Sequence, residues 1–183
     1  MKRPGELLTR GPVVLRRWRA ADADTVCDLV VASLEHLRPW MSWAAGFGPR
    51  DAARFAAQCE QDWESGAAFN YAIISGGAPA GSCGLMARSG AGGLEIGYWV
   101  AARYLRRGLA TAAAGALVDA AFGLPGIGQV EIVHDAANVA SGGVPPKLGF
   151  TQIARRPHPD GPQAPAESGT DVVWRLTRPG RAR

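Results

Sequence analysis

The sequence predicts a single mixed α/β domain, with helices around a sheet that contains an antiparallel meander. Apolar residues recur at helical spacing in residues 23–37 and 49–65, whereas residues 69–100 contain short apolar runs separated by glycines. The chain has 183 residues, of which 47% are hydrophobic. This length and composition suffice for the core of one domain, so we expect one domain over residues 1–183.

The first half is predicted to contain one strand and two helices. The strand covers residues 13–18 (VVLRRW), and the aspartates after it begin a helix that ends before Pro39. One face of that helix is apolar and consists of Val26, Leu29, Val30, Leu34 and Leu37. An aromatic-rich loop (RPWMSWAAGFG) leads to the second helix, which has Pro49 near its start and Gly66 just past its end.

The second half alternates strands with helices. Three short strands form the meander, at residues 69–75, 82–88 and 93–100. A helix follows Gly108, and its apolar face consists of Leu109, Ala113, Ala116, Leu117 and Ala120. The remaining predicted elements are a strand at 128–135, a short helix that ends at Gly149, and a strand at 170–177. The Pro- and Gly-rich residues 156–169 are predicted to form a surface loop.

Charge and cysteine content argue against several classes of function. The net charge is +4, but the basic residues occur in short groups, which is typical of scattered surface charge rather than of a nucleic-acid interface. The cysteines at positions 27, 59 and 83 form no CxxC, so neither a disulfide framework nor a metal site is predicted. No apolar run approaches the ~18 residues that a membrane span needs. We expect a soluble, cytoplasmic protein with no nucleic-acid or membrane partner.

The stretch YLRRGLATAAAGALVDAAF, residues 104–122, places two arginines and a glycine directly before an alanine-rich helix. A glycine turn that enters a helix leaves the first N–H groups unpaired, and such groups can bind phosphate oxygens. Gly108 can adopt backbone conformations that other residues resist, and the small Ala110 lets a ligand approach the main chain. The alternative is an ordinary turn with solvated arginines. The segment matches neither a Walker loop nor a dinucleotide-binding glycine motif.

Two segments together resemble a known family. Leu105-x-x-Gly108-x-Ala110 resembles the acyl-CoA pyrophosphate loop of the GNAT superfamily of N-acetyltransferases. The later motif of that superfamily resembles N-x-x-S-x-x-V-x-x-K-L-G-F at residues 138–150, at the matching separation. The runs EIGYWV and LRPWMSWA resemble the branch named for the RimJ and RimL ribosomal-protein N-terminal acetyltransferases. The similarity covers about residues 13–177, which we take as the core of the domain.

The resemblance implies a fold and a cosubstrate. The fold is a mixed, mostly antiparallel sheet of about seven strands with helices on both faces, in which strands four and five splay apart; here these are residues 93–100 and 129–135. The pantetheine arm of acetyl-CoA, or of another acyl-CoA, lies in the gap, and no metal is required. The expected CoA-binding residues are Tyr98, Trp99, Val100, Arg106, Arg107, Gly108, Leu109, Ala110, Thr111, Asn138, Ser141 and Lys147.

The sequence departs from the family pattern at three places. Leu105 stands where the wider superfamily often has Gln or Arg, which removes one polar contact but leaves the main-chain cradle. Pro145 and Pro146 lie early in the helix after Ser141, where they are tolerated but cannot donate backbone hydrogen bonds. Pro145 also occupies the position where several relatives carry a tyrosine acid. No tyrosine can therefore donate a proton from that position.

Acyl transfer to an amine needs a group that accepts a proton from nitrogen, and the departing thiolate benefits from a donor. Glu95 on the splayed strand is the first candidate base, although a solvated position on the outward face is an equal alternative. His134 is the second candidate, with a structural or surface role as the alternative. Ser141 could donate to the thiolate, cap the following helix, or do both. Cys83 is more typical of a core thiol than of an acyl carrier, which favours direct transfer.

The sequence defines the acceptor site less well. Trp40, Met41 and Trp43 could wall the amine pocket opposite the loop at 157–169, although core packing explains the tryptophans equally well. We expect an acetyl-CoA-dependent N-acetyltransferase acting on a primary amine, by resemblance a protein N-terminus. The alternatives are a small-molecule amine (antibiotic, amino acid or polyamine) as acceptor, or a catalytically silent CoA-binding regulator. A monomer or a homodimer is expected.

Overall fold

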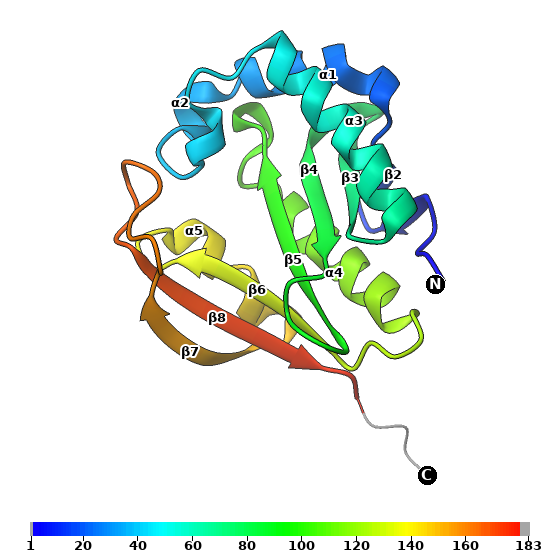
Figure 1. Cartoon of the computed structure of the whole chain (residues 1–183), viewed down its shortest axis with the longest axis vertical. Coiled ribbons are helices and arrows are strands. Elements are labelled where there is room, and N and C mark those ends of the chain that lie inside the picture. Colours follow the sequence, from blue (N-terminus) through cyan, green and yellow to red (C-terminus); the bar gives the residue numbers. More distant parts are fainter. Residues whose placement is uncertain (1, 180–183) are drawn as a thin grey trace.

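The computed structural model describes residues 2–179, in which eight strands form one open sheet in the order β1-β2-β3-β4-β5-β6-β8-β7 (Figure 1). The strands are β1 (Leu7–Arg10), β2 (Val13–Arg17), β3 (Ala68–Ser75), β4 (Ala78–Met86), β5 (Gly93–Val100), β6 (Gln129–Asp135), β7 (Thr151–Pro157) and β8 (Thr170–Thr177). Every neighbouring pair is antiparallel except β5 and β6, which run parallel. The predicted mixed, mostly antiparallel sheet is confirmed, with one strand more than expected.

Helices cover both faces of this sheet. They are α1 (Ala23–Val31), α2 (Leu34–Leu37), α3 (Pro49–Ser65), α4 (Leu109–Phe122) and α5 (Val139–Gly142), with 3-10 turns at Ala20–Asp22, Ser42–Ala44, Ala102–Tyr104 and Pro145–Leu148. The helices α1 and α3 pack together on one face, and α4 lies behind the sheet on the other (Figure 1). In the part of the chain that the structure describes, no helix combines the length and the apolar character needed to cross a membrane.

The predicted helix over residues 23–37 is interrupted, so that α1 and α2 are separate. The interruption falls at Ala32 and Ser33. Ser33 is buried, and its hydroxyl oxygen accepts a hydrogen bond from the backbone N–H of Ala102 at 3.3 Å. A buried hydroxyl needs such a partner. The break therefore ties the first helix to the 3-10 turn that precedes the predicted phosphate loop.

The two strands that sequence patterns did not indicate, β1 and β7, are the edges of the sheet. Six of the seven residues of β7 are exposed, so the strand has no apolar alternation that could reveal it. The strand β4 also begins earlier than predicted, at Ala78. Gly76 and Gly77 both have positive φ angles, 59° and 78°, and form a tighter turn than the six-residue turn expected from the sequence.

Two apolar cores fix the positions of β5 and of the start of α4. The larger core lies between α4 and the sheet and includes the fully buried Leu85, Ile96 and Leu117. The smaller core, between the sheet and the helices α1 and α3, includes Trp18 and Val30. Truncating one large side chain in such a core typically costs about 2–5 kcal/mol of stability. The strand β5 and the start of α4 are therefore fixed relative to each other.

Candidate active site

The strands β5 and β6 diverge after a short contact. Their parallel register covers only Gly93, Leu94 and Glu95, opposite residues 129–131 of β6. Beyond Glu95, β5 remains paired with β4 through Val100, whereas β6 continues along β8 (Figure 1). The main chain of Tyr98, Trp99 and Val100 therefore has no strand partner on the β6 side among the described residues. The strands thus diverge where the family resemblance predicts, between residues 93–100 and residues 129–135.

The turn before α4 forms a concave array of backbone N–H groups. Arg106 and Gly108 have φ angles of 59° and 74°, and Gly108 is the N-cap residue of α4. The first N–H group of the helix to find a main-chain acceptor is that of Ala112, which donates to the Gly108 carbonyl at 3.0 Å. Within residues 2–179, the N–H groups from Arg106 to Thr111 have no acceptor. A helix N-terminus with such a turn favours anions.

The surroundings of this turn fit a diphosphate. A Cβ atom on Gly108 would meet no described atom within 4 Å, so the space above the turn is open. Arg103 and Arg107 stack on the ring of Tyr104, with guanidinium-to-centroid distances of 5.0 and 5.3 Å. The arginine side chains are exposed and can reach a bound anion. The residues that the sequence assigns to CoA phosphates are thus brought together at one end of the gap.

A large cavity opens beside the splay, on the face covered by α1 and α3. Its volume is about 1170 Å³, and its lining includes Trp40, Met41 and Trp43, together with Glu95 and Ser141. The predicted opposite rim, residues 157–169, contributes His158 and Glu167. The N–H group of Ala166 in that rim donates to the Pro39 carbonyl at 2.9 Å, so the two rims touch. A cavity of this size accommodates a peptide segment.

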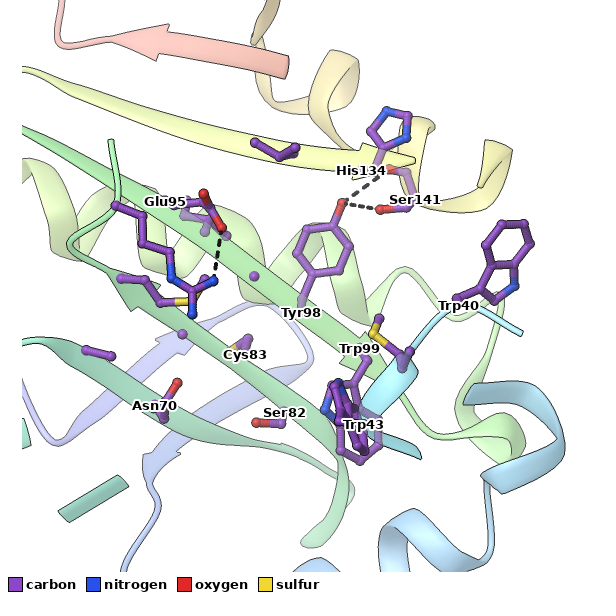
Figure 2. Close-up of a pocket in the computed structure, with 18 of the residues that line it drawn as sticks. Trp40, Trp43, Asn70, Ser82, Cys83, Glu95, Tyr98, Trp99, His134 and Ser141 are labelled. Atoms are coloured by element: carbon purple, nitrogen blue, oxygen red, sulfur yellow. Dashed lines mark hydrogen bonds and ion pairs between the residues drawn. The ribbon is translucent and has the colours of Figure 1, made fainter. Parts of the chain in front are cut away.

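Aromatic side chains form one lip of the cavity. The ring of Trp43 packs on Trp99 with centroids 6.0 Å apart (Figure 2). It also packs on Phe47, with centroids 5.7 Å apart. Trp43 is 42% exposed, whereas Trp99 is partly buried behind it. The lip therefore offers an exposed apolar surface beside the position of the predicted acyl group. Trp43 is a lining residue rather than a core residue.

The cavity is rich in carboxylates. Six acidic residues line it: Asp51, Asp62, Glu95, Asp135, Glu167 and Asp171. Three arginines line it: Arg54, Arg88 and Arg156. Not every one of these carboxylates is free to bind a ligand, because Asp135 already accepts backbone hydrogen bonds from Ser168, Gly169 and Thr170. The excess of negative charge contrasts with the overall charge of +4 and favours a cationic ligand.

Glu95 lies at the point where the strands part. Its side chain is 23% exposed and lines the cavity, and its carboxylate lies 3.8 Å from the guanidinium of Arg88 (Figure 2). Burial raises the pKa of Glu95 above its ordinary value, Arg88 lowers it, and the nearby carboxylates of Glu131 and Asp171 raise it further. A carboxylate with a raised pKa is a better proton acceptor for an amine.

The ring of His134 has both nitrogens engaged. Its Nε2 atom accepts a hydrogen bond from the indole N–H of Trp174 at 3.0 Å. Its Nδ1 atom lies 2.8 Å from the Asp135 carbonyl oxygen, which can only accept, so Nδ1 carries the proton. The ring also lies against Gly142, where an added Cβ would approach Cε1 to 2.9 Å. These contacts favour the structural alternative for His134.

Ser141 lies in α5, at the β6 side of the gap. Its backbone N–H donates to the side chain of Asn138, which caps this helix, at 3.1 Å. Its hydroxyl lies 3.3 Å from the hydroxyl of Tyr98, and no side chain caps the following 3-10 turn (Figure 2). Lys147 is exposed in that turn and lies outside the cavity lining. Its assignment to CoA binding stays a prediction.

The comparison with known families decides what kind of protein this is. Residues 13–151 match the family described as the acetyltransferase (GNAT) domain. The chain belongs to the GNAT acetyltransferases. This GNAT protein is therefore an acyl-CoA-dependent N-acetyltransferase, and both the resemblance and the fold predicted from the sequence are confirmed.

Individual relatives of the GNAT protein agree with this assignment. YdaF of Bacillus subtilis (strain 168), whose name places it among the ribosomal N-acetyltransferases, is 27% identical over 145 residues, and the match covers 76% of this chain and 78% of YdaF. The structure of RimL, a ribosomal-protein α-N-acetyltransferase, with coenzyme A has a TM-score of 0.86 at 16% identity and covers 94% of this chain and 98% of RimL. These relatives support the RimJ/RimL-like branch.

A second similar structure belongs to an enzyme with a different role. The microcin self-immunity acetyltransferase MccE, in complex with acetyl-CoA and AMP, has a TM-score of 0.83 at 18% identity, and the match covers 91% of this chain and 93% of MccE. At this level of identity the two solved structures establish the shared fold. The acceptor of this GNAT protein has to be argued from its own cavity.

Sequence reasoning on this GNAT protein missed side chains that the fold brings to the cavity. Phe47 and Asp171 come from two distant segments, and the side chain of Trp99, a residue that was expected only to bind CoA, lines the cavity with them. No role was predicted for the Tyr98 hydroxyl, although Tyr98 itself was expected to bind CoA. The period of two in EIGYWV was the available signal, since it places Glu95 and Trp99 on one face of β5 and Tyr98 on the other. Cys83 is buried, and burial raises the pKa of its thiol, which suits a core residue.

Proposed function

We propose that this GNAT protein transfers an acetyl group from acetyl-CoA to the primary amine at the N-terminus of a protein. The observation that carries the proposal is that the two ends of the β5–β6 gap have opposite electrostatic character. One end of the gap has unpaired N–H groups and arginines, and the other opens into a carboxylate-rich, aromatic cavity. An anionic donor and a cationic acceptor can thus meet at the gap from opposite directions.

The chain's own residues would hold the donor at three places. The N–H groups from Arg106 to Thr111 would bind the diphosphate, as helix N-termini do. The unpaired edge of β5 at Tyr98, Trp99 and Val100 would pair with the pantetheine amides, in the manner of an added strand. Asn138 and Ser141 would contact the thiol end. When bound, acetyl-CoA supplies an acyl carbon that is activated as a thioester.

Glu95 and Ser141 would perform the two proton transfers. Glu95 would accept a proton from the acceptor ammonium, directly or through a water, because only a neutral amine has the lone pair needed for attack. Its raised pKa and its position at the base of the gap support this role. Ser141 would donate its hydroxyl proton as the carbon–sulfur bond breaks. Cys83 would take no part, which implies direct transfer in a ternary complex.

The charge of the cavity supports a protein N-terminus over a free amino acid. A free amino acid brings a carboxylate close to its amine, and six acidic residues against three arginines would repel it. A peptide places an amide there instead and can extend along the aromatic lip. The relative YdaF bears the name of a ribosomal N-acetyltransferase, which supports a protein acceptor.

Thiol release from acetyl-CoA, measured with a panel of amines, tests the proposal. The panel contains short peptides with free N-termini, the same peptides with blocked N-termini, free amino acids, a polyamine and an aminoglycoside. We expect release with the free peptides and none with the blocked ones, and mass spectrometry should find the acetyl group on the N-terminal nitrogen. Release with small amines alone would overturn the protein acceptor. Binding of CoA without release for any amine would instead support the silent regulator.

A further inference from the structure

The side chain of Tyr98 crosses the gap between the splayed strands. It leaves β5 on the face that α4 covers and packs partly against the larger core. Its hydroxyl oxygen lies 3.1 Å from the Ser141 carbonyl oxygen and 3.3 Å from Ser141 Oγ (Figure 2). Among residues 2–179, these are the hydrogen bonds that join β5 to α5. The Tyr98 phenol therefore connects β5 to α5 across the gap, at the proposed proton donor Ser141.

The chemistry of these groups fixes the direction of the hydrogen bonds. A carbonyl oxygen only accepts, so the Tyr98 hydroxyl donates its single proton to the Ser141 carbonyl. The Tyr98 oxygen then has lone pairs free, and the Ser141 hydroxyl can donate to one of them. The Ser141 oxygen is thereby held at the gap, and its proton, which points to Tyr98 before the reaction, reaches the leaving sulfur by rotation about the Cβ–Oγ bond. A serine hydroxyl without such a partner rotates freely.

The short helix α5 is also held from its other sides. The Asn138 side chain accepts the Ser141 N–H, and the ring of His134 lies directly beneath Gly142. Trp174 and the Asp135 carbonyl fix that ring in one orientation. A four-residue helix has little stability of its own, so these contacts determine where Ser141 lies. The contact from Tyr98 is the one that reaches the hydroxyl itself.

Tyr98 is a suitable partner for Ser141 because it keeps its proton and because the usual tyrosine donor of the family is absent from this chain. Pro145 stands where the family resemblance places a tyrosine donor, and proline has no proton to give. Burial raises the pKa of Tyr98 to about 12, and its hydrogen bond with Ser141 offsets this only in part. Tyr98 is therefore a neutral phenol with its proton in place throughout the neutral and mildly alkaline range. Its hydrogen bonds to Ser141 persist wherever an amine is deprotonated enough to react.

We propose that Tyr98 is a positioning residue that acts through Ser141, holding the Ser141 hydroxyl at the gap so that it protonates the leaving sulfur. The inference rests on the proposed function. In the step, a carbon–nitrogen bond forms, the carbon–sulfur bond breaks, and its electron pair goes to sulfur. The Ser141 O–H bond breaks as the S–H bond forms. The acylated nitrogen releases a proton to water, and water returns one to the Ser141 oxygen.

Four variants test this role: Tyr98→Phe, Ser141→Ala, the double variant, and Tyr71→Phe as the matched control. Tyr71 also donates its hydroxyl to a main-chain carbonyl, that of Gly5 at 2.9 Å, but lies outside the cavity lining. We expect Tyr98→Phe to lower kcat by about 10- to 100-fold, a part of the full effect of a general acid. Calorimetry should find the Kd for CoA changed by less than about twofold, because no CoA contact is assigned to the phenol oxygen.

The double variant decides whether the two residues act together. If Tyr98 acts through Ser141, the double variant should turn over no more slowly than Ser141→Ala, within about twofold. Multiplied losses would overturn the proposal, as would a kcat for Tyr98→Phe equal to that of Tyr71→Phe, or a Kd for CoA that rises as much as kcat falls. Absence of amine-dependent thiol release from the wild type would overturn the proposed function, and the role of Tyr98 with it.

Discussion

The two sides of the β5–β6 gap are built from different parts of the chain. The CoA side consists mainly of main-chain N–H groups, supplied by residues 106–111 at the start of α4 and by one strand edge. The acceptor side consists of side chains from α3, the Ser42–Ala44 turn, β5, β8 and the loop between β7 and β8. The first side depends on backbone conformation, whereas the second depends on which side chains the fold brings together. A change on one side should therefore leave the other nearly intact.

This difference explains what the sequence could reveal. A main-chain site leaves a local signature, because Gly108 and the spacing before α4 are enough to form it. The splayed strands at 93–100 and 129–135 and the helix after Gly108 were predicted with nearly the observed bounds. The cavity has no local signature, since Trp43, Trp99 and Asp171 meet only after folding. For the same reason the sequence alone left Glu95 and His134 as open alternatives.

The largest expected effect comes from Glu95→Gln, which removes the proposed base from the acceptor side. We expect kcat to fall by about 10²- to 10⁴-fold, the usual contribution of a general base. In the wild type, kcat should decline as the pH falls through the raised pKa of Glu95, and the variant should lack this decline. Calorimetry should find the affinity for CoA unchanged. Glu35→Gln, on the exposed surface of α2, is the control.

Glu95→Gln is expected to lower activity but to increase the stability of the folded protein at neutral pH. Folding raises the pKa of Glu95 above its ordinary value of 4.5, so the folded state favours the protonated form. The contribution to the free energy of unfolding is then fully present below pH 4.5 and is lost as the pH rises through the folded pKa. Glu95→Gln should therefore raise the Tm at neutral pH, by about 2–4 °C for each kcal/mol recovered. An unchanged or lower Tm would contradict the assigned burial cost.

A smaller effect is expected from Gly108→Val, on the CoA side. At a φ of 74° a valine is strained, so the turn must change and the N–H array is disrupted. Loss of one or two hydrogen bonds to a charged group should weaken CoA binding by about 10- to 100-fold in calorimetry. Gly11→Val is the matched control, because Gly11 has a φ of 55° in an equally open turn far along the chain. If both variants lost the same affinity for CoA, the CoA site could not be assigned to the turn at Gly108.

The smallest effect is expected from Asp171→Asn, on the acceptor side. Asp171 lines the cavity opposite Arg156 of β7 and forms no salt bridge with a described residue, so its carboxylate can still attract an acceptor amine. We expect KM for a peptide amine to rise by about 2- to 5-fold, as for a partly solvated ion pair, and the increase should shrink at high salt. Asp160→Asn, in the exposed part of the rim loop, should leave KM unchanged. An equal rise in both variants would indicate long-range charge rather than a local contact.

Amide hydrogen exchange, followed by NMR with and without CoA, tests the central claim most directly. We expect CoA to slow exchange of the N–H groups of Leu109, Ala110 and Thr111 and of the free β5 edge at Tyr98 and Val100, whose amides point away from β4. The amides of the rim loop, residues 157–169, should exchange at unchanged rates until an acceptor peptide is added. Protection of the rim loop by CoA, with no change at the start of α4, would contradict the assignment of the two sides.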